Sequence, residues 1–179
     1  ESLRDSVIAV SGQADFTMSG PPVMLQASAS GLQTVAATAR PRRSIYLMAR
    51  RTYPLTFLGV FDYPIIDVTC TRRVPSASPL QSLTMINSEF FTQSASHLAR
   101  RIEALVGSAA PVVEKIATAY RLTLARNPSD LELQAGKDHL KRLQTLYAAS
   151  DVAPAETTQQ PFESLVHMLL CSNEFLYLD

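Results

Sequence analysis

Residues 88–107, SEFFTQSASHLARRIEALVG, decide the fold class of this chain. Apolar and small side chains recur there every three or four residues, which is the period of one face of an α-helix. Gly107 at the end is typical of the residue after the last helical turn, because glycine adopts a left-handed backbone without strain. The pattern predicts a helix whose buried face carries Phe90 or Phe91, Ser94, His97 or Leu98, Arg101 or Ile102, and Leu105.

The helical period continues on both sides of this stretch. Residues 78–87, SPLQSLTMIN, begin with Ser78 as a helix N-cap and Pro79 at the first helical position. Leu80, Leu83 and Ile86 form one apolar stripe on that helix, and we expect them to be buried.

Three more segments complete the predicted helical part. Residues 111–127 and 127–147 read as two helices, the second of which opens with a capping box of Ser129 and Glu132. The polar Ala/Thr/Gln stretch at 149–160 is interpreted as a linker. Residues 161–178 are predicted to form a final, tightly buried apolar helix. The carboxy-terminal hundred residues therefore predict a unit of four or five packed helices.

The amino-terminal part has weaker patterns. Residues 1–12 read as the end of a helix, and residues 13–43 as a long loop with one short strand at 23–28. Alternating side chains predict a short strand at 44–50, and Pro54 opens a short helix that Pro64 closes.

The predicted fold class is therefore mainly α. A bundle-like helical unit covers residues 78–179, and an irregular, Arg-rich segment with one or two short strands covers residues 1–77. We expect one domain over 1–179. Because position 1 is Glu rather than Met, we expect it to be the carboxy-terminal part of a larger protein.

Composition excludes several classes of protein. Of the 179 residues 46% are apolar and 18% are charged, which is typical of a globular domain. No run of eighteen apolar residues occurs, so no membrane span is predicted. The balance of 16 basic and 16 acidic residues argues against nucleic-acid binding.

The two cysteines carry no recognisable motif. Cys70 and Cys171 lie about a hundred residues apart and outside any CxxC or CxxCH pattern. This excludes a covalently attached c-type haem and a Cys-rich zinc site within the chain. Each is expected to be a small buried apolar residue, and the spacing does not decide whether they form a disulfide.

No catalytic motif is present either. His97, His139 and His167 lie on three different predicted helices, none with a second ligand at metal spacing, so we predict no metal site. The sequence has no nucleotide-binding, hydrolase or metalloprotease signature. Whether the chain is an enzyme is left undecided.

The charge distribution gives the first functional indication. Seven of the 16 basic residues fall within residues 40–73, and all seven are arginines. Only Asp62 and Asp67 oppose them, so this segment has a formal charge of +5 and the remainder −5.

Two interpretations of this cluster stay open. Arginine grips carboxylate, sulfate or phosphate with two parallel hydrogen bonds and stacks on aromatic rings, so the cluster could bind an anion. Alternatively, the arginines pair with the net negative charge of the helical part, or with a neighbouring domain, and so tie loops down. We favour this latch. We expect Arg43→Ala or Arg50→Ala to strand a buried partner and destabilise the domain by about 1–3 kcal/mol. The candidate site residues are Arg42, Arg43, Tyr46, Arg50, Arg51, Asp62, Arg72 and Arg73.

Several ordered blocks resemble a planctomycete-specific domain of unknown function, in particular its carboxy-terminal portion. They are LRDSVIAVSGQADFTMSGPPV, RPRRSIYLMARRTYPLTFLGVFDYP, VTCTRRVPSASPLQSLTMIN, ARNPSDLELQ and FESLVHMLLCSNEFLYLD. That domain typically occurs in large proteins beside a cytochrome-c-like domain. The resemblance implies an exported, periplasmic or otherwise extracytoplasmic location and a role near redox or polysaccharide metabolism, but it supplies no reaction.

The resemblance leads to three hypotheses. The leading one is an accessory or interaction module that docks another domain of the same polypeptide or a cytochrome-like partner, or holds an anionic polysaccharide. The second is half of an enzyme site in which Asp62, Cys70 and the arginines are completed by an upstream domain. The third is an electron-transfer partner surface. No cofactor is expected in this chain, and any haem is expected in a separate domain.

Overall fold

The computed structural model describes residues 1–29, 31–36, 38–50, 52–64, 69–73, 76–149 and 154–177, without the side chains of 154–159. These residues divide into two compact units, each considered by itself. The first unit comprises residues 1–9 and 13–88, and the second comprises residues 10–12 and 89–179. None of the helices in the described ranges is long and apolar enough to cross a membrane.

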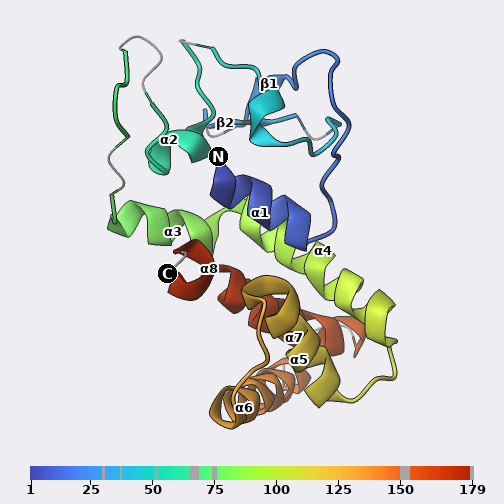
Figure 1. Cartoon of the computed structure of the whole chain (residues 1–179). Coiled ribbons are helices and arrows are strands. Elements are labelled where there is room, and N and C mark those ends of the chain that lie inside the picture. Colours follow the sequence, from blue (N-terminus) through green and yellow to red (C-terminus); the bar gives the residue numbers. More distant parts are fainter. Residues whose placement is uncertain are drawn as a thin grey trace. The chain divides into compact units, whose positions relative to one another are not determined.

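The second unit consists of packed helices, as the sequence predicts (Figure 1). Its elements are α4 (Glu89–Val106), α5 (Val112–Leu124), α6 (Asp130–Ala148), α7 (Pro154–Leu170) and α8 (Asn173–Leu176). Helix α7 packs against α4 and α6, and α5 contacts all three. The side chains at the centre are nearly inaccessible: Phe91, Ala95, Leu98, Ile102, Ile116, Leu165, Val166 and Leu170.

Two predicted helix ends of the second unit are confirmed. Ser129 and Glu132 form the capping box at the start of α6, each side chain bonded to the other residue's backbone N–H. Gly107 has a φ of +92° and follows the end of α4. Leu105, in the last turn of α4, is 61% exposed rather than buried. The helical period shows which face an apolar residue lies on, but not whether another helix covers that face at its position.

The predicted linker at 149–160 is wrong for residues 154–160, because α7 begins at Pro154. Proline is accepted in the first turn of a helix, and the Ala, Glu and Gln that follow are good helix formers. Residues 150–153 lie outside the described part of the chain. The predicted final helix is also interrupted: it ends at Leu170, and Ser172 caps the separate helix α8 through a hydrogen bond from the Phe175 N–H.

The first unit has less regular structure. It contains α1 (Ser2–Val10), β1 (Leu25–Ala27), β2 (Gln33–Val35), the 3-10 helix η1 (Ser44–Tyr46), α2 (Thr56–Val60) and α3 (Pro79–Asn87). Strands β1 and β2 form an antiparallel hairpin with Leu25 opposite Val35 and Ala27 opposite Gln33. The helices at both ends and the strand within 23–28 are confirmed, and β2 was not predicted. A short helix follows Pro54 as predicted, but α2 begins only at Thr56 and ends at Val60, before Pro64.

The predicted strand at 44–50 is wrong. Residues Ser44–Tyr46 form the 3-10 helix η1, and only Leu47 keeps a bridge, to Val23. The Asp5 carboxylate accepts hydrogen bonds from the Ser44 N–H (2.7 Å) and hydroxyl (2.6 Å). These bonds satisfy Ser44 without a neighbouring strand, so the alternation of side chains here does not reflect sheet pairing.

The expected burial of α3 is reversed. Leu80, Leu83 and Ile86 are 54–58% exposed, whereas Gln81 and Met85 are buried. Ser78 caps the helix as predicted, but the capping box is completed by the side chain of Gln81. That side chain also donates to the Val60 carbonyl (3.1 Å) at the end of α2. A buried amide, rather than the apolar stripe, therefore orients this helix.

Candidate functional site

Arg42 is the most fully engaged residue of the arginine cluster. Its side chain reaches the loop that precedes β1: Nη2 donates to the carbonyls of Thr17 (2.8 Å) and Ser19 (2.5 Å), and Nη1 donates to that of Pro21 (3.0 Å). The guanidinium also lies 3.7 Å from the ring centre of Tyr46. Only 7% of Arg42 is exposed. A cation so placed satisfies loop carbonyls and stacks on an aromatic face, which is the behaviour of a latch.

The Arg42 side chain lies between two chain segments that run parallel. Isolated bridges join Asp15 to Arg42 and Val23 to Leu47. Between them, the Ser19 N–H donates to the Tyr46 hydroxyl (3.2 Å). We call residues 15–23 and 42–47 the parallel pair. Polar contacts with Arg42 and Tyr46 hold residues 17–21 of this pair in place.

Arg4 and Asp5 of α1 also contact the parallel pair, and the sequence did not lead us to predict either contact. The buried Arg4 guanidinium donates to the Arg42 carbonyl (2.9 Å) and the Ser44 hydroxyl (3.3 Å). Burial lowers the pKa of Arg4, and the neighbouring Asp5 opposes that shift. The available signal was that Arg4 shares a helical face with the buried Val7 and Ile8.

Asp62 is a structural acceptor. It has a φ of +58° and accepts hydrogen bonds from the Ser76 N–H (2.7 Å), the Ser76 hydroxyl (2.8 Å) and the Gln81 amide (3.4 Å). The bonds from Ser76, the backbone one first, lower the pKa of this carboxyl below its ordinary value. A carboxylate whose oxygens already accept hydrogen bonds and whose pKa is lowered is a weak general base.

Two other arginines of the segment make exposed ion pairs. Arg73 grips the Glu1 carboxylate with both terminal nitrogens, at 2.7 and 3.2 Å. Arg40 lies 3.6 Å from Asp15. Because the arginine of each pair is largely accessible to water, each pair contributes little to stability.

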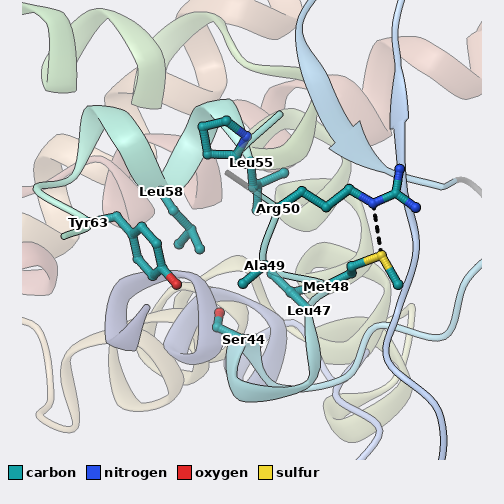
Figure 2. A pocket seen from close by; sticks show the side chains of 9 residues that line it. Ser44, Leu47, Met48, Ala49, Arg50, Leu55, Leu58 and Tyr63 are labelled. Carbon is teal, nitrogen blue, oxygen red and sulfur yellow. Dashed lines mark hydrogen bonds between the residues drawn. The ribbon is translucent and has the colours of Figure 1, made fainter. Parts of the chain in front are cut away.

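Arg50 lines a small pocket with Tyr63, Ser44 and Leu58 (Figure 2). Its Nε donates to the Met48 sulfur at 3.0 Å. The pocket has a volume of about 30 Å³, enough for one or two water molecules and far below the several hundred Å³ of ordinary ligand sites. Arg43, Tyr46 and Asp62 are not among its lining residues. The predicted residues are therefore not assembled around this pocket.

The remaining candidates contribute exposed charge. Arg43, Arg50 and Arg72 are exposed, and Arg51 lies outside the described residues. Among the described residues, the expected buried partner of Arg43 or Arg50 is not found; Arg42 is instead the buried arginine of the segment. The expected burial of Cys70 is wrong as well, because it is exposed, and neither cysteine is in a disulfide. Cys171 is half-buried, which raises its thiol pKa to about 11.

The second unit contains one strong ionic cluster. Arg126 bonds Glu132 (2.7 and 2.9 Å) and Glu174 (2.5 and 2.7 Å) and lies 5.5 Å from the ring centre of Tyr120. The hydrogen bonds from Arg126 lower the pKa of Glu132 to about 2. This cluster joins the start of α6 to α8. Among the described residues, no three His, Cys, Asp or Glu side chains gather as a metal-binding group.

Comparison with known proteins identifies a family but no reaction. Residues 1–140 match the family model PSD1, described as a protein of unknown function (DUF1553). Neither the curated proteins nor the solved structures give a match. The matched region stops within α6, whereas α7 packs against both α4 and α6. The folded second unit therefore extends beyond the matched residues.

Proposed function

This chain belongs to the PSD1 family of proteins of unknown function (DUF1553), and we propose that it is a non-catalytic interaction module. In this proposal it forms part of a larger exported, cytochrome-associated protein. Its arginine-rich segment works as a latch that fixes the parallel pair, so that another domain of the same polypeptide can dock there.

The observation that carries the proposal is the engagement of Arg42. Its guanidinium donates to three carbonyls of residues 17–21 and stacks on Tyr46, while Arg4 donates to the Arg42 carbonyl. Buried charges are tolerated only when they are well hydrogen-bonded. These contacts give a loop with little apolar burial of its own a fixed shape. A fixed loop shape favours docking because less conformational entropy is lost on binding.

Two observations weigh against the other hypotheses. A sulfated or uronic sugar needs a larger cavity than the pocket beside Arg50. A shared enzyme site would need Asp62 as a base, but its oxygens already accept bonds from Ser76 and Gln81. The electron-transfer hypothesis requires a haem-bearing neighbour in contact with residues 40–73, and it remains a less supported alternative.

Hydrogen–deuterium exchange tests the latch. Arg42→Ala should raise amide exchange across residues 15–23, because three carbonyls lose their donor, while exchange in α4 and α7 stays unchanged. Arg43→Ala is the matched control, since Arg43 is exposed beside the same element. Equal protection of residues 15–23 in the wild type and Arg42→Ala would contradict the latch.

A further inference from the structure

We propose that the parallel pair presents a docking surface for a protein partner that displays carboxylates beside an apolar patch. The surface consists of Phe16, Met18, Ile45 and Arg43 of the parallel pair, together with Arg40, two residues before the second segment of the pair. We call it the arginine–apolar surface. The inference rests on the proposed latch and adds the chemistry of the partner.

The apolar part of this surface is held outward. Phe16 is 65% exposed, Met18 72% and Ile45 79%. Between the first two, the Thr17 N–H and hydroxyl donate to the Asp15 carboxylate, and the Thr17 carbonyl accepts from Arg42. The loop is thus fixed by polar contacts while its large apolar side chains face water. Exposed apolar groups on a fixed backbone are typical of interaction sites.

The cationic groups of the surface are the arginines Arg40 and Arg43, of which Arg40 is paired with Asp15. Arg40 is 78% exposed and lies beside Asp15, while Arg43 immediately precedes η1 and is also exposed. The first unit as a whole has eight arginines, no lysine and five acidic residues, which gives a formal charge of +3. This positive charge is complementary to an acidic partner.

The residue types favour a protein over a lipid surface. Protein interfaces are enriched in aromatic residues, methionine and arginine and depleted in lysine. Guanidinium groups bind carboxylates with two parallel hydrogen bonds, whereas attraction to anionic lipids uses lysine and arginine about equally. A surface with Phe16, Met18 and arginines but no lysine therefore matches carboxylates set around an apolar patch.

Selection from a random peptide library displayed on phage tests the proposal with the full chain as bait. We expect enriched peptides to combine Asp or Glu with Leu or Phe and to lose binding as salt rises. Phe16→Ala should weaken the best synthetic peptide about tenfold, and Arg43→Ala about three- to tenfold. Leu131→Ala and Arg72→Ala, two exposed positions elsewhere, are the controls and should bind as the wild type does.

Several results would overturn the proposal. Enriched peptides that are neutral or basic, or that bind Phe16→Ala and wild type equally, exclude an acidic partner here. Phe16-dependent sedimentation with phosphatidylserine vesicles would assign the surface to a membrane. Concentration-dependent dimerisation lost in Phe16→Ala would assign it to a second copy. If Arg42→Ala loosens residues 15–23 but one of these results is obtained, the latch stands and only the partner is wrong.

Discussion

The two units of this chain are stabilised in different ways. In the second unit, apolar side chains such as Phe91, Leu98 and Leu165 meet between helices and are fully buried. Among the described residues, the first unit buries the arginines Arg4 and Arg42 and the amide of Gln81 beside its own apolar core, whereas the buried polar side chains of the second unit are serines and threonines. Apolar packing tolerates small shifts in geometry, whereas hydrogen bonds depend on direction and distance. The stability of the second unit therefore depends mainly on the volume of its buried side chains. The stability of the first unit depends more on particular hydrogen-bond donors and acceptors.

The largest expected effect is in the second unit. Phe91→Ala removes a ring that is 0% exposed and should lower the free energy of unfolding of that unit by about 3–5 kcal/mol. Urea unfolding followed by far-UV circular dichroism measures the loss. Leu131→Ala, at a residue 84% exposed on α6, should change it by less than about 0.5 kcal/mol. Equal effects of the two substitutions would mean that the volume of buried side chains does not determine the stability of this unit.

The next largest effect is expected at the latch. Arg42→Ala leaves three carbonyls without their donor and should destabilise the first unit by about 2–3 kcal/mol. Arg42→Lys should recover only part of the loss, because an ammonium cannot reproduce the planar fork or the stacking on Tyr46. Arg43→Ala serves as the control and should be nearly neutral in thermal unfolding. Full rescue by lysine would show that charge alone suffices.

A smaller effect distinguishes polar from apolar residues within one helix. Gln81→Ala should destabilise α3 by about 1–2 kcal/mol, because Gln81 is 4% exposed and bonds the Val60 carbonyl and Asp62. Leu83→Ala should cost less than about 0.5 kcal/mol, since Leu83 is 54% exposed. Thermal melts of both variants test this order. A larger loss in Leu83→Ala would restore the apolar stripe as the buried face.

The sequence predicts the second unit well because the relevant information is local. The period of apolar residues in 88–107 and the Ser129–Glu132 capping box depend on neighbours within a few positions. The exceptions depend on distant partners. The polar stretch at 154–160 is the first part of α7, a helix that packs against α4 and α6. Leu105 is exposed although it has the right period.

The charge imbalance of residues 40–73 is visible in the sequence, but the contacts of its arginines are not. The predicted latch paired these arginines with acidic residues, whereas Arg42 donates to backbone carbonyls. Which arginine is buried depends on Thr17, Ser19 and Pro21, which lie more than twenty residues earlier. The roles of Arg4 and Asp5 depend on residues 42 and 44 in the same way. Such contacts between distant backbone carbonyls and side chains leave no period in the sequence.

The smallest effect concerns the ionic cluster of Arg126 in the second unit. Glu132 is held by Arg126, which lowers its pKa from an ordinary value of 4.5 to about 2. Between these values the unfolded chain binds more protons at this position than the folded one. Stability is therefore fully present above pH 4.5 and decreases as the pH falls towards 2. Because the pair is about one-third exposed, its contribution is at most about 1 kcal/mol.

Glu132→Gln should remove this part of the acid sensitivity, since a glutamine can still accept the Ser129 N–H bond of the capping box but carries no charge. Glu114→Gln, at an exposed glutamate on α5, is the control and should leave the pH dependence as in the wild type. Unfolding by urea at a series of pH values between 2 and 5 measures both variants against the wild type. An unaltered slope in Glu132→Gln would mean that Glu174 alone keeps Arg126 in place.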